Sequence, residues 1–132
     1  MAVSICKVCG HIEFSESPER CPVCYATSFS RNDNVFAESM EKSKEGAVKH
    51  IPSIKVVKEC GLIPEESCTD VLVRIGEKLH PSTPEHYILF IDCYVDNKFV
   101  SRGLLTPDSQ PAVIFHLKAS SGSCKVVAQC NL

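Results

Sequence analysis

The sequence lacks any apolar run near the roughly 20 residues that a membrane-spanning helix needs. Its first residues, Met1 to Ile5, reach Cys6 without the apolar segment of a secretory signal peptide. A strong charge of either sign is also missing: residues 1–48 carry 5 basic and 7 acidic side chains, residues 49–132 carry 9 of each, and the net charge is -2. We therefore expect a cytoplasmic protein that binds neither a membrane nor nucleic acid.

Cysteine, in contrast, is abundant, with nine among 132 residues. An odd number of cysteines without an export signal argues against a disulfide framework. Four of them form two Cys-x-x-Cys pairs, which indicate metal binding in a reducing compartment. A chain of this length has room for one compact domain with its own core and one small additional module.

The two Cys-x-x-Cys pairs predict a metal site with four sulfur ligands. These are Cys6, Cys9, Cys21 and Cys24. Hairpin knuckles of this kind place four sulfurs tetrahedrally, and Gly10 supplies a permissive backbone that lets amides point at the sulfurs. The segment is too short to fold without metal, so a mononuclear site is favoured over unpaired or disulfide-bonded cysteines.

The rest of the chain predicts a linker followed by an antiparallel β-sandwich. Residues 32–47 are polar, and Glu38, Lys42 and Glu45 have a helical spacing that allows one or two turns. Later runs rich in β-branched and aromatic residues are bounded by turn residues, and Asp96-Asn97 predicts a tight hairpin. The expected strands cover residues 54–57, 69–75, 86–95, 98–104, 112–117 and 125–130. We expect a mainly β protein with a metal knuckle module at 1–31, a linker at 32–47 and a sandwich at 48–132.

A second metal site is predicted on the sandwich, around a loop that proline stiffens. His80-Pro81 and Thr83-Pro84-Glu85-His86 precede an apolar strand, and proline holds the residue before it extended, so both histidines can be aimed at one point. Ordinary loop histidines are the alternative. The candidate ligands are His50, His80, His86 and Cys130. Three imidazoles and one thiolate suit iron, zinc or copper, and their spacing alone does not select among these metals.

Residues 4–30 resemble the rubredoxin-like module of rubrerythrins. The resemblance rests on Cys-Lys-Val-Cys-Gly, starting at Cys6, and on Pro-Glu-Arg-Cys-Pro-Val-Cys, starting at Pro18. It implies iron held by four thiolates and used for one-electron transfer. Where that family has glycine after the second knuckle, this chain has Tyr25, a bulky residue that enters a left-handed conformation at a cost. Zinc in a structural ribbon therefore remains the alternative to iron.

Residues 46–132 resemble the iron domain of desulfoferrodoxin and neelaredoxin, the superoxide reductases. The motifs are Lys-His-Ile-Pro from Lys49, the segment from Val73 to Ile88 with both histidines, and the final Cys-Asn-Leu from Cys130. The resemblance implies an immunoglobulin-like sandwich and a ferrous centre with four equatorial histidines and one axial cysteine. It also implies that superoxide is reduced to hydrogen peroxide, that rubredoxin or a similar protein donates the electron, and that the protein is a homo-oligomer. His50, His80 and His86 would be equatorial ligands, Cys130 the axial ligand, and Lys49 the cation that attracts superoxide.

Two departures from that family bear on activity. Val48 stands where the family commonly has a glutamate, and the sequence reaches Leu132 one residue before the fourth histidine of the Cys-Asn-x-His motif. The Leu132 carboxylate or a water could supply an oxygen instead, or His116 or His11 could substitute, although both are expected on the surface. We expect a weakened iron site; a non-catalytic electron-transfer or metal-binding module is the alternative.

The other four cysteines are expected to be small buried or half-buried hydrophobic residues. They are Cys60, Cys68, Cys93 and Cys124. Cys60 and Cys68 flank a polar turn, so they are the pair most able to form an oxidation-sensitive disulfide.

Overall fold

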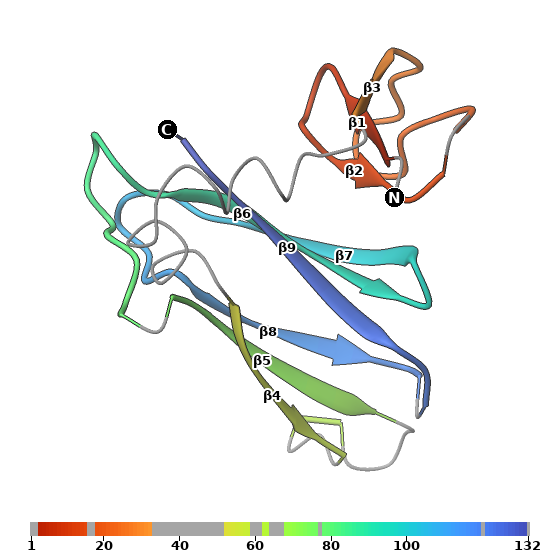
Figure 1. The fold of residues 1–132 in the computed structure, drawn as a ribbon. Coiled ribbons are helices and arrows are strands. Elements are labelled where there is room, and N and C mark those ends of the chain that lie inside the picture. The colour runs from red at the N-terminus through yellow and green to blue at the C-terminus, as the bar shows by residue number, and fades with distance from the viewer. Residues whose placement is uncertain are drawn as a thin grey trace.

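The computed structural model describes residues 3–15, 18–32, 52–58, 62–63, 68–76, 78–119 and 121–131. In these ranges every regular element is a β-strand, and the strands form three antiparallel sheets (Figure 1). None of the described residues belongs to a helix long and apolar enough to span a membrane. The predicted linker from residue 33 onward, including its helical turns, lies outside the described residues.

The smallest sheet frames the two cysteine knuckles. It consists of β1 (Val3–Cys6), β2 (Ile12–Glu13) and β3 (Phe29–Asn32) in the order β2-β1-β3. The first knuckle connects β1 to β2, and the second lies between β2 and β3. The sheet therefore holds both Cys-x-x-Cys pairs at one of its ends.

The other two sheets form the predicted sandwich. One contains β4 (Pro52–Val57), β5 (Thr69–Ile75) and β8 (Ala112–Leu117) in the order β4-β5-β8, and the other contains β6 (Ile88–Val95), β7 (Lys98–Leu104) and β9 (Cys124–Cys130) in the order β7-β6-β9. Their facing sides enclose the main core. Asp96 and Asn97 have φ values of 50° and 64° and connect β6 to β7, which confirms the predicted hairpin turn.

Strand β6 is buried on both faces. Ile91 and Cys93 face the core between the sheets, whereas Tyr94 belongs to a second cluster with Val3, Ile12 and Val127 from the small sheet and β9. The small sheet thus packs on the outer face of β7-β6-β9 (Figure 1). Burial on both sides explains why β6 reads as a nearly continuous apolar run.

Three strand boundaries differ from the sequence-based expectation. Strand β6 begins at Ile88 rather than at residue 86, β4 begins at Pro52 rather than at residue 54, and β9 begins at Cys124 rather than at residue 125. Only the first difference concerns the predicted site. It places His86 in a turn that precedes the strand, because His86 pairs with Thr83 across that turn instead of with a neighbouring strand.

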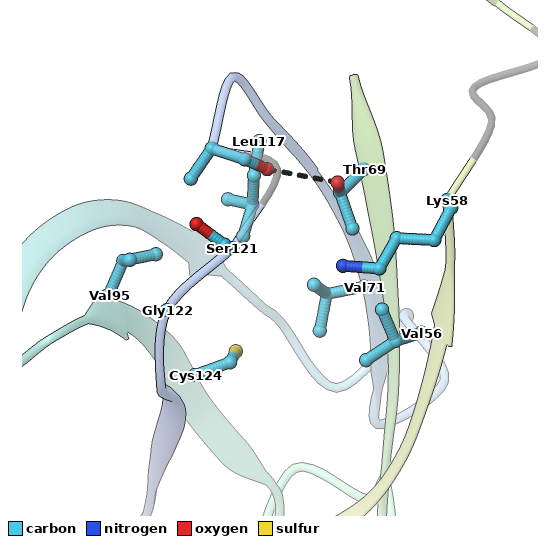
Figure 2. Close-up of a pocket in the computed structure, with 10 residues that line it drawn as sticks. Val56, Lys58, Thr69, Val71, Val95, Leu117, Ser121, Gly122 and Cys124 are labelled. Atoms are coloured by element: carbon cyan, nitrogen blue, oxygen red, sulfur yellow. Dashed lines mark hydrogen bonds between the residues drawn. The ribbon is translucent and has the colours of Figure 1, made fainter. Parts of the chain in front are cut away.

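A cavity of about 280 Å³ opens at one end of the sandwich (Figure 2). Its lining includes Val95 at the end of β6 and Cys124 at the start of β9, and the Cys124 sulfur and the Lys58 amine point into it. The predicted histidine and cysteine site instead lies near the start of β6 and the end of β9. The cavity is therefore separate from the predicted metal sites.

Candidate metal centres

The four cysteines of the knuckles converge on one point. Their sulfurs lie within 4.8 Å of one another, with Cys6 Sγ 3.5 Å from Cys24 Sγ and Cys9 Sγ 3.6 Å from Cys21 Sγ. Four metal–sulfur bonds of about 2.3 Å in a tetrahedron place sulfurs about 3.8 Å apart. The cluster therefore fits the four-thiolate site that the sequence predicts, and it fits iron or zinc equally well.

Left-handed residues close both knuckles. Gly10 has a φ of 78° and donates its N–H to Cys6 O at 3.0 Å, and Tyr25 has a φ of 65° and donates to Cys21 O at 2.9 Å. The expectation that Tyr25 enters the left-handed region is confirmed. Val23 N–H also points at Cys21 Sγ, 3.4 Å away, as expected for a knuckle that stabilises thiolates.

Three of the four thiols have shifted pKa values in the absence of metal, and the shifts differ in direction. Burial disfavours the Cys6 thiolate, but hydrogen bonds from the backbone N–H groups of Cys9 and Val8 outweigh it and lower the pKa of Cys6 to about 7. Burial raises the pKa of Cys9 to about 12 and also raises that of Cys21. Among these three thiols, Cys6 is therefore the one that is partly ionised near neutral pH and most able to bind a metal ion first.

A second cluster brings together His80, His86 and Cys130. One ligand atom from each lies within 4.8 Å of the others, and the two imidazole rings are 4.6 Å apart at an angle of 76°. His80 is buried, whereas His86 and Cys130 are half-buried. His80 Nδ1 lies 2.8 Å from Pro81 O. Since a carbonyl only accepts, Nδ1 carries the proton and Nε2 is the nitrogen that can ligate a metal.

Short backbone hydrogen bonds fix both histidines. His80 N–H donates to Ile75 O at 3.1 Å, which ties it to the end of β5. Thr83 N–H donates to His86 O at 2.9 Å, and His86 N–H donates back to Thr83 O at 3.0 Å. The proline-stiffened loop thus becomes a closed turn that presents His86 towards His80.

Asn131 joins the end of β9 to this turn, a role that the sequence did not reveal. Its side-chain oxygen accepts the Tyr87 N–H at 2.9 Å, its side-chain amide donates to Glu85 O at 3.1 Å, and its own N–H donates to Tyr87 O at 3.0 Å. Cys130 precedes it and pairs with Ile88 in the sheet. Asn131 thereby holds Cys130 beside His86. Its place directly after the cysteine was the available signal.

The other predicted site residues have different outcomes. Lys49 and His50 lie outside the described residues, so their positions in the site stay predictions. His116 is exposed on β8, as expected. The expectation that His11 is a surface residue of the knuckle is wrong, because its exposed fraction is 0%. It is covered because the small sheet packs on β6, where His11 Nδ1 lies 2.9 Å from the Asp92 carboxylate.

Cys93 and Cys124 are both free. Cys93 is buried and Cys124 is half-buried, which confirms the expectation for this pair. Cys68 is disulfide-bonded. Its predicted partner, Cys60, lies outside the described residues.

Two known families match the two parts of the chain that contain these clusters. The desulfoferrodoxin family model matches residues 39–132, and the model for the rubredoxin-like domain of rubrerythrin matches residues 5–29. The first match covers more than half of the chain. The chain belongs to the desulfoferrodoxin family. The predicted resemblance to both families is confirmed.

Relatives of this desulfoferrodoxin-family chain align over much of its length. A desulfoferrodoxin homolog from Archaeoglobus fulgidus is 28% identical over 133 residues, which cover 100% of this chain and 91% of the relative. A superoxide reductase from Pyrococcus abyssi is 32% identical over 96 residues, 64% of this chain and 78% of the relative. A solved superoxide reductase (neelaredoxin) from Ignicoccus hospitalis has a TM-score of 0.55 at 26% identity and covers 74% of this chain and 81% of that one.

The superoxide reductase from Treponema pallidum shares the fold over nearly the whole chain. Its TM-score is 0.60 at 22% identity, with 98% of this chain and 92% of that chain covered. The all-β, two-part architecture therefore recurs in solved structures.

Proposed function

We propose that this protein is a non-haem iron oxidoreductase that reduces superoxide to hydrogen peroxide. The observation that carries the proposal is the convergence of His80, His86 and Cys130 from a loop and a strand end that are far apart in the sequence. Membership of the desulfoferrodoxin family and similarity to proteins named superoxide reductases support it. His50 is proposed as the third imidazole ligand, and Lys49 as the cation that attracts superoxide.

The chemistry divides between the metal and the side chains. Iron bound by this donor set supplies one electron per turnover. Cys130 contributes a thiolate, which donates electron density towards the metal position, while the fixed Nε2 of His80 contributes a neutral donor. Superoxide takes up the electron and two protons from solvent to become hydrogen peroxide. Because His86 and Cys130 are only half-buried, a small anion can approach this side of the cluster.

The remaining roles follow from the family and from the first cluster. Iron or zinc is proposed at Cys6, Cys9, Cys21 and Cys24, and rubredoxin or a similar small protein is proposed as the electron donor. We further propose a cytoplasmic homo-oligomer. None of these roles requires nucleic acid or a membrane.

Two single substitutions test where the chemistry occurs. Cys130→Ser should abolish superoxide reduction, measured by stopped-flow spectroscopy after a superoxide pulse, because it removes the only thiolate of the His80, His86 and Cys130 cluster. Cys21→Ser should retain the reaction with superoxide, because it removes a ligand of the first cluster and leaves His80, His86 and Cys130 unchanged. The reverse pattern would overturn the assignment.

Metal analysis separates this enzyme from a non-catalytic metal-binding module. Protein purified without oxygen should contain two metal ions per chain, at least one of them iron. A single ion that Cys21→Ser removes and His80→Ala leaves untouched would indicate that the sandwich holds no metal. The protein would then be an electron-transfer or metal-binding module.

A further inference from the structure

A third group of metal-ligating side chains lies on the outer face of the sheet β4-β5-β8. It consists of Cys68, Asp70 and His116, and one ligand atom from each lies within 4.8 Å of the others. His116 Nδ1 is 2.7 Å from Asp70 Oδ1, and Cys68 Sγ is 3.8 Å from the same oxygen. None of the three belongs to the proposed iron site or to the four-cysteine cluster.

The strand register explains why these side chains meet. Asp70 of β5 pairs directly with His116 of β8, and side chains alternate along a strand, so Cys68 lies on the same face as Asp70. Thr69, between them, is buried on the opposite face. Packing of the core therefore fixes which face carries the cluster, because a strand that pointed the Asp70 side chain into the core would point the Thr69 side chain out to solvent.

We propose that these three side chains form a zinc site that exists only when the Cys68 disulfide is reduced. Thiolate, carboxylate and imidazole are the donors that zinc prefers, and three protein ligands leave one tetrahedral position for water. Bonds of about 2.0 to 2.3 Å place such ligand atoms about 3.3 to 3.6 Å apart. The observed distances of 2.7 and 3.8 Å need adjustments of less than about 1 Å.

The redox state of Cys68 determines whether this site can bind zinc. Cys68 is disulfide-bonded, while seven other described cysteines are free, which is consistent with Cys60 as the predicted partner. A disulfide sulfur is a poor metal ligand, whereas a thiolate is a strong one. A thiol reductant supplies two electrons and two protons, becomes a disulfide itself and leaves two cysteine thiols. Zinc then displaces the Cys68 proton, so binding releases one proton.

The simpler reading of the same residues is a surface ion pair. The His116 and Asp70 side chains are 36% and 17% exposed, and an ion pair this accessible to water contributes little to stability. That reading accounts for two of the three side chains. It predicts no dependence of zinc binding on the redox state of Cys68.

Equilibrium dialysis against zinc tests the proposal. Purified protein with its own metals in place is dialysed with and without a phosphine reductant, and zinc per chain is then measured. We expect one additional zinc per chain in the reduced protein. His116→Ala and Cys68→Ser should remove it, and Asp108→Asn, at an exposed carboxylate outside the cluster, should not. Cys60→Ser should bind the additional zinc without reductant, because Cys68 is then already a thiol.

Cobalt in place of zinc gives a second readout that identifies the ligand. The reduced protein should show a sulfur-to-cobalt absorption band that is absent in Cys68→Ser, while circular dichroism confirms that each variant folds. Equal zinc uptake by reduced and oxidised protein would overturn the proposal. So would unchanged uptake in reduced His116→Ala, because the additional ion would then be bound elsewhere.

Discussion

Asp92 is a buried carboxylate on the outer face of β6, and the side chains of two residues contact it. Arg102 reaches it with two nitrogens at 2.6 and 2.9 Å, and His11 reaches it at 2.9 Å. Burial opposes the charge of Arg102, but contact with Asp92 raises its pKa overall. Arg102 also donates to Cys9 O at 3.1 Å. One carboxylate thus orients an arginine and a histidine that both contact the first knuckle.

The raised pKa of Cys93, on the core face of the same strand, makes the free energy of unfolding depend on pH. Burial raises its pKa to about 12, whereas a cysteine in an unfolded chain loses its proton near about pH 8.5. Above that pH the unfolded chain releases a proton that the folded chain retains. The contribution of this thiol to the free energy of unfolding is therefore fully present below about pH 8.5 and is lost as the pH rises towards 12. The loss from this thiol should reach about 2 kcal/mol near pH 10.

Denaturant unfolding of the reduced protein at several pH values measures this loss. In Cys93→Ala, the free energy of unfolding should decrease less between about pH 8.5 and pH 10 than in the wild type. Val126→Ala is the matched control, since Val126 pairs with Cys93 and does not titrate. Parallel profiles for the wild type and Cys93→Ala would contradict the prediction.

At the scale of elements, the loop before β6 and the end of β9 form one unit through Asn131. Its three hydrogen bonds to Glu85 and Tyr87 connect segments that lie 44 to 46 residues apart. His80 and His86 come from the loop, and Cys130 comes from the strand end. The geometry of the second cluster therefore depends on a residue that contributes no ligand to it.

Asn131→Ala should weaken metal binding at His80, His86 and Cys130 by about 10- to 100-fold, the usual effect of losing a residue that orients ligands. Metal retained during dialysis against a chelator measures the effect. Retention at the four cysteines should not change, and Gln110→Ala, at an exposed amide, should behave like the wild type. Asn131→Asp keeps the acceptor for Tyr87 but loses the donor to Glu85, so we expect an intermediate loss. Equal retention in all variants would show that Cys130 is positioned without Asn131.

The strands and cysteine pairs could be predicted from the sequence because their signals are local. Alternation, the turn at Asp96-Asn97 and the spacing of Cys-x-x-Cys each extend over a few residues. The burial of His11 could not be predicted, because the carboxylate that it contacts, Asp92, is 81 residues away in the sequence. The role of Asn131 was missed for the same reason. Long-range hydrogen bonds leave no periodic pattern in a sequence.

At the scale of the whole molecule, β6 lies between two cores. Its inner face packs on β5 and β8. The outer face of its sheet packs on the small sheet through Tyr94 of β6, Phe99 of β7 and Val127 of β9. The Tyr94 hydroxyl donates to Ile12 O, and Arg102 lies over the Phe90 ring, 3.6 Å from its centre. The small sheet has little core of its own, so the proposed metal and this interface together stabilise it. Loss of the metal from the small sheet should therefore also destabilise the sandwich.

Cys21→Ser tests this coupling. Without the fourth sulfur the small sheet should lose its metal and separate from β6, which exposes Tyr94, Phe99 and Val127 and lowers the free energy of unfolding by about 3 kcal/mol or more. Hydrogen exchange can resolve the effect strand by strand. Amides of β6, β7 and β9 should exchange faster than in the wild type, whereas those of β4 and β5, which belong to the other sheet of the sandwich, should change little. Unchanged exchange in β6 would mean that the sandwich is stable without its covering module, and a uniform increase would mean that both modules unfold together.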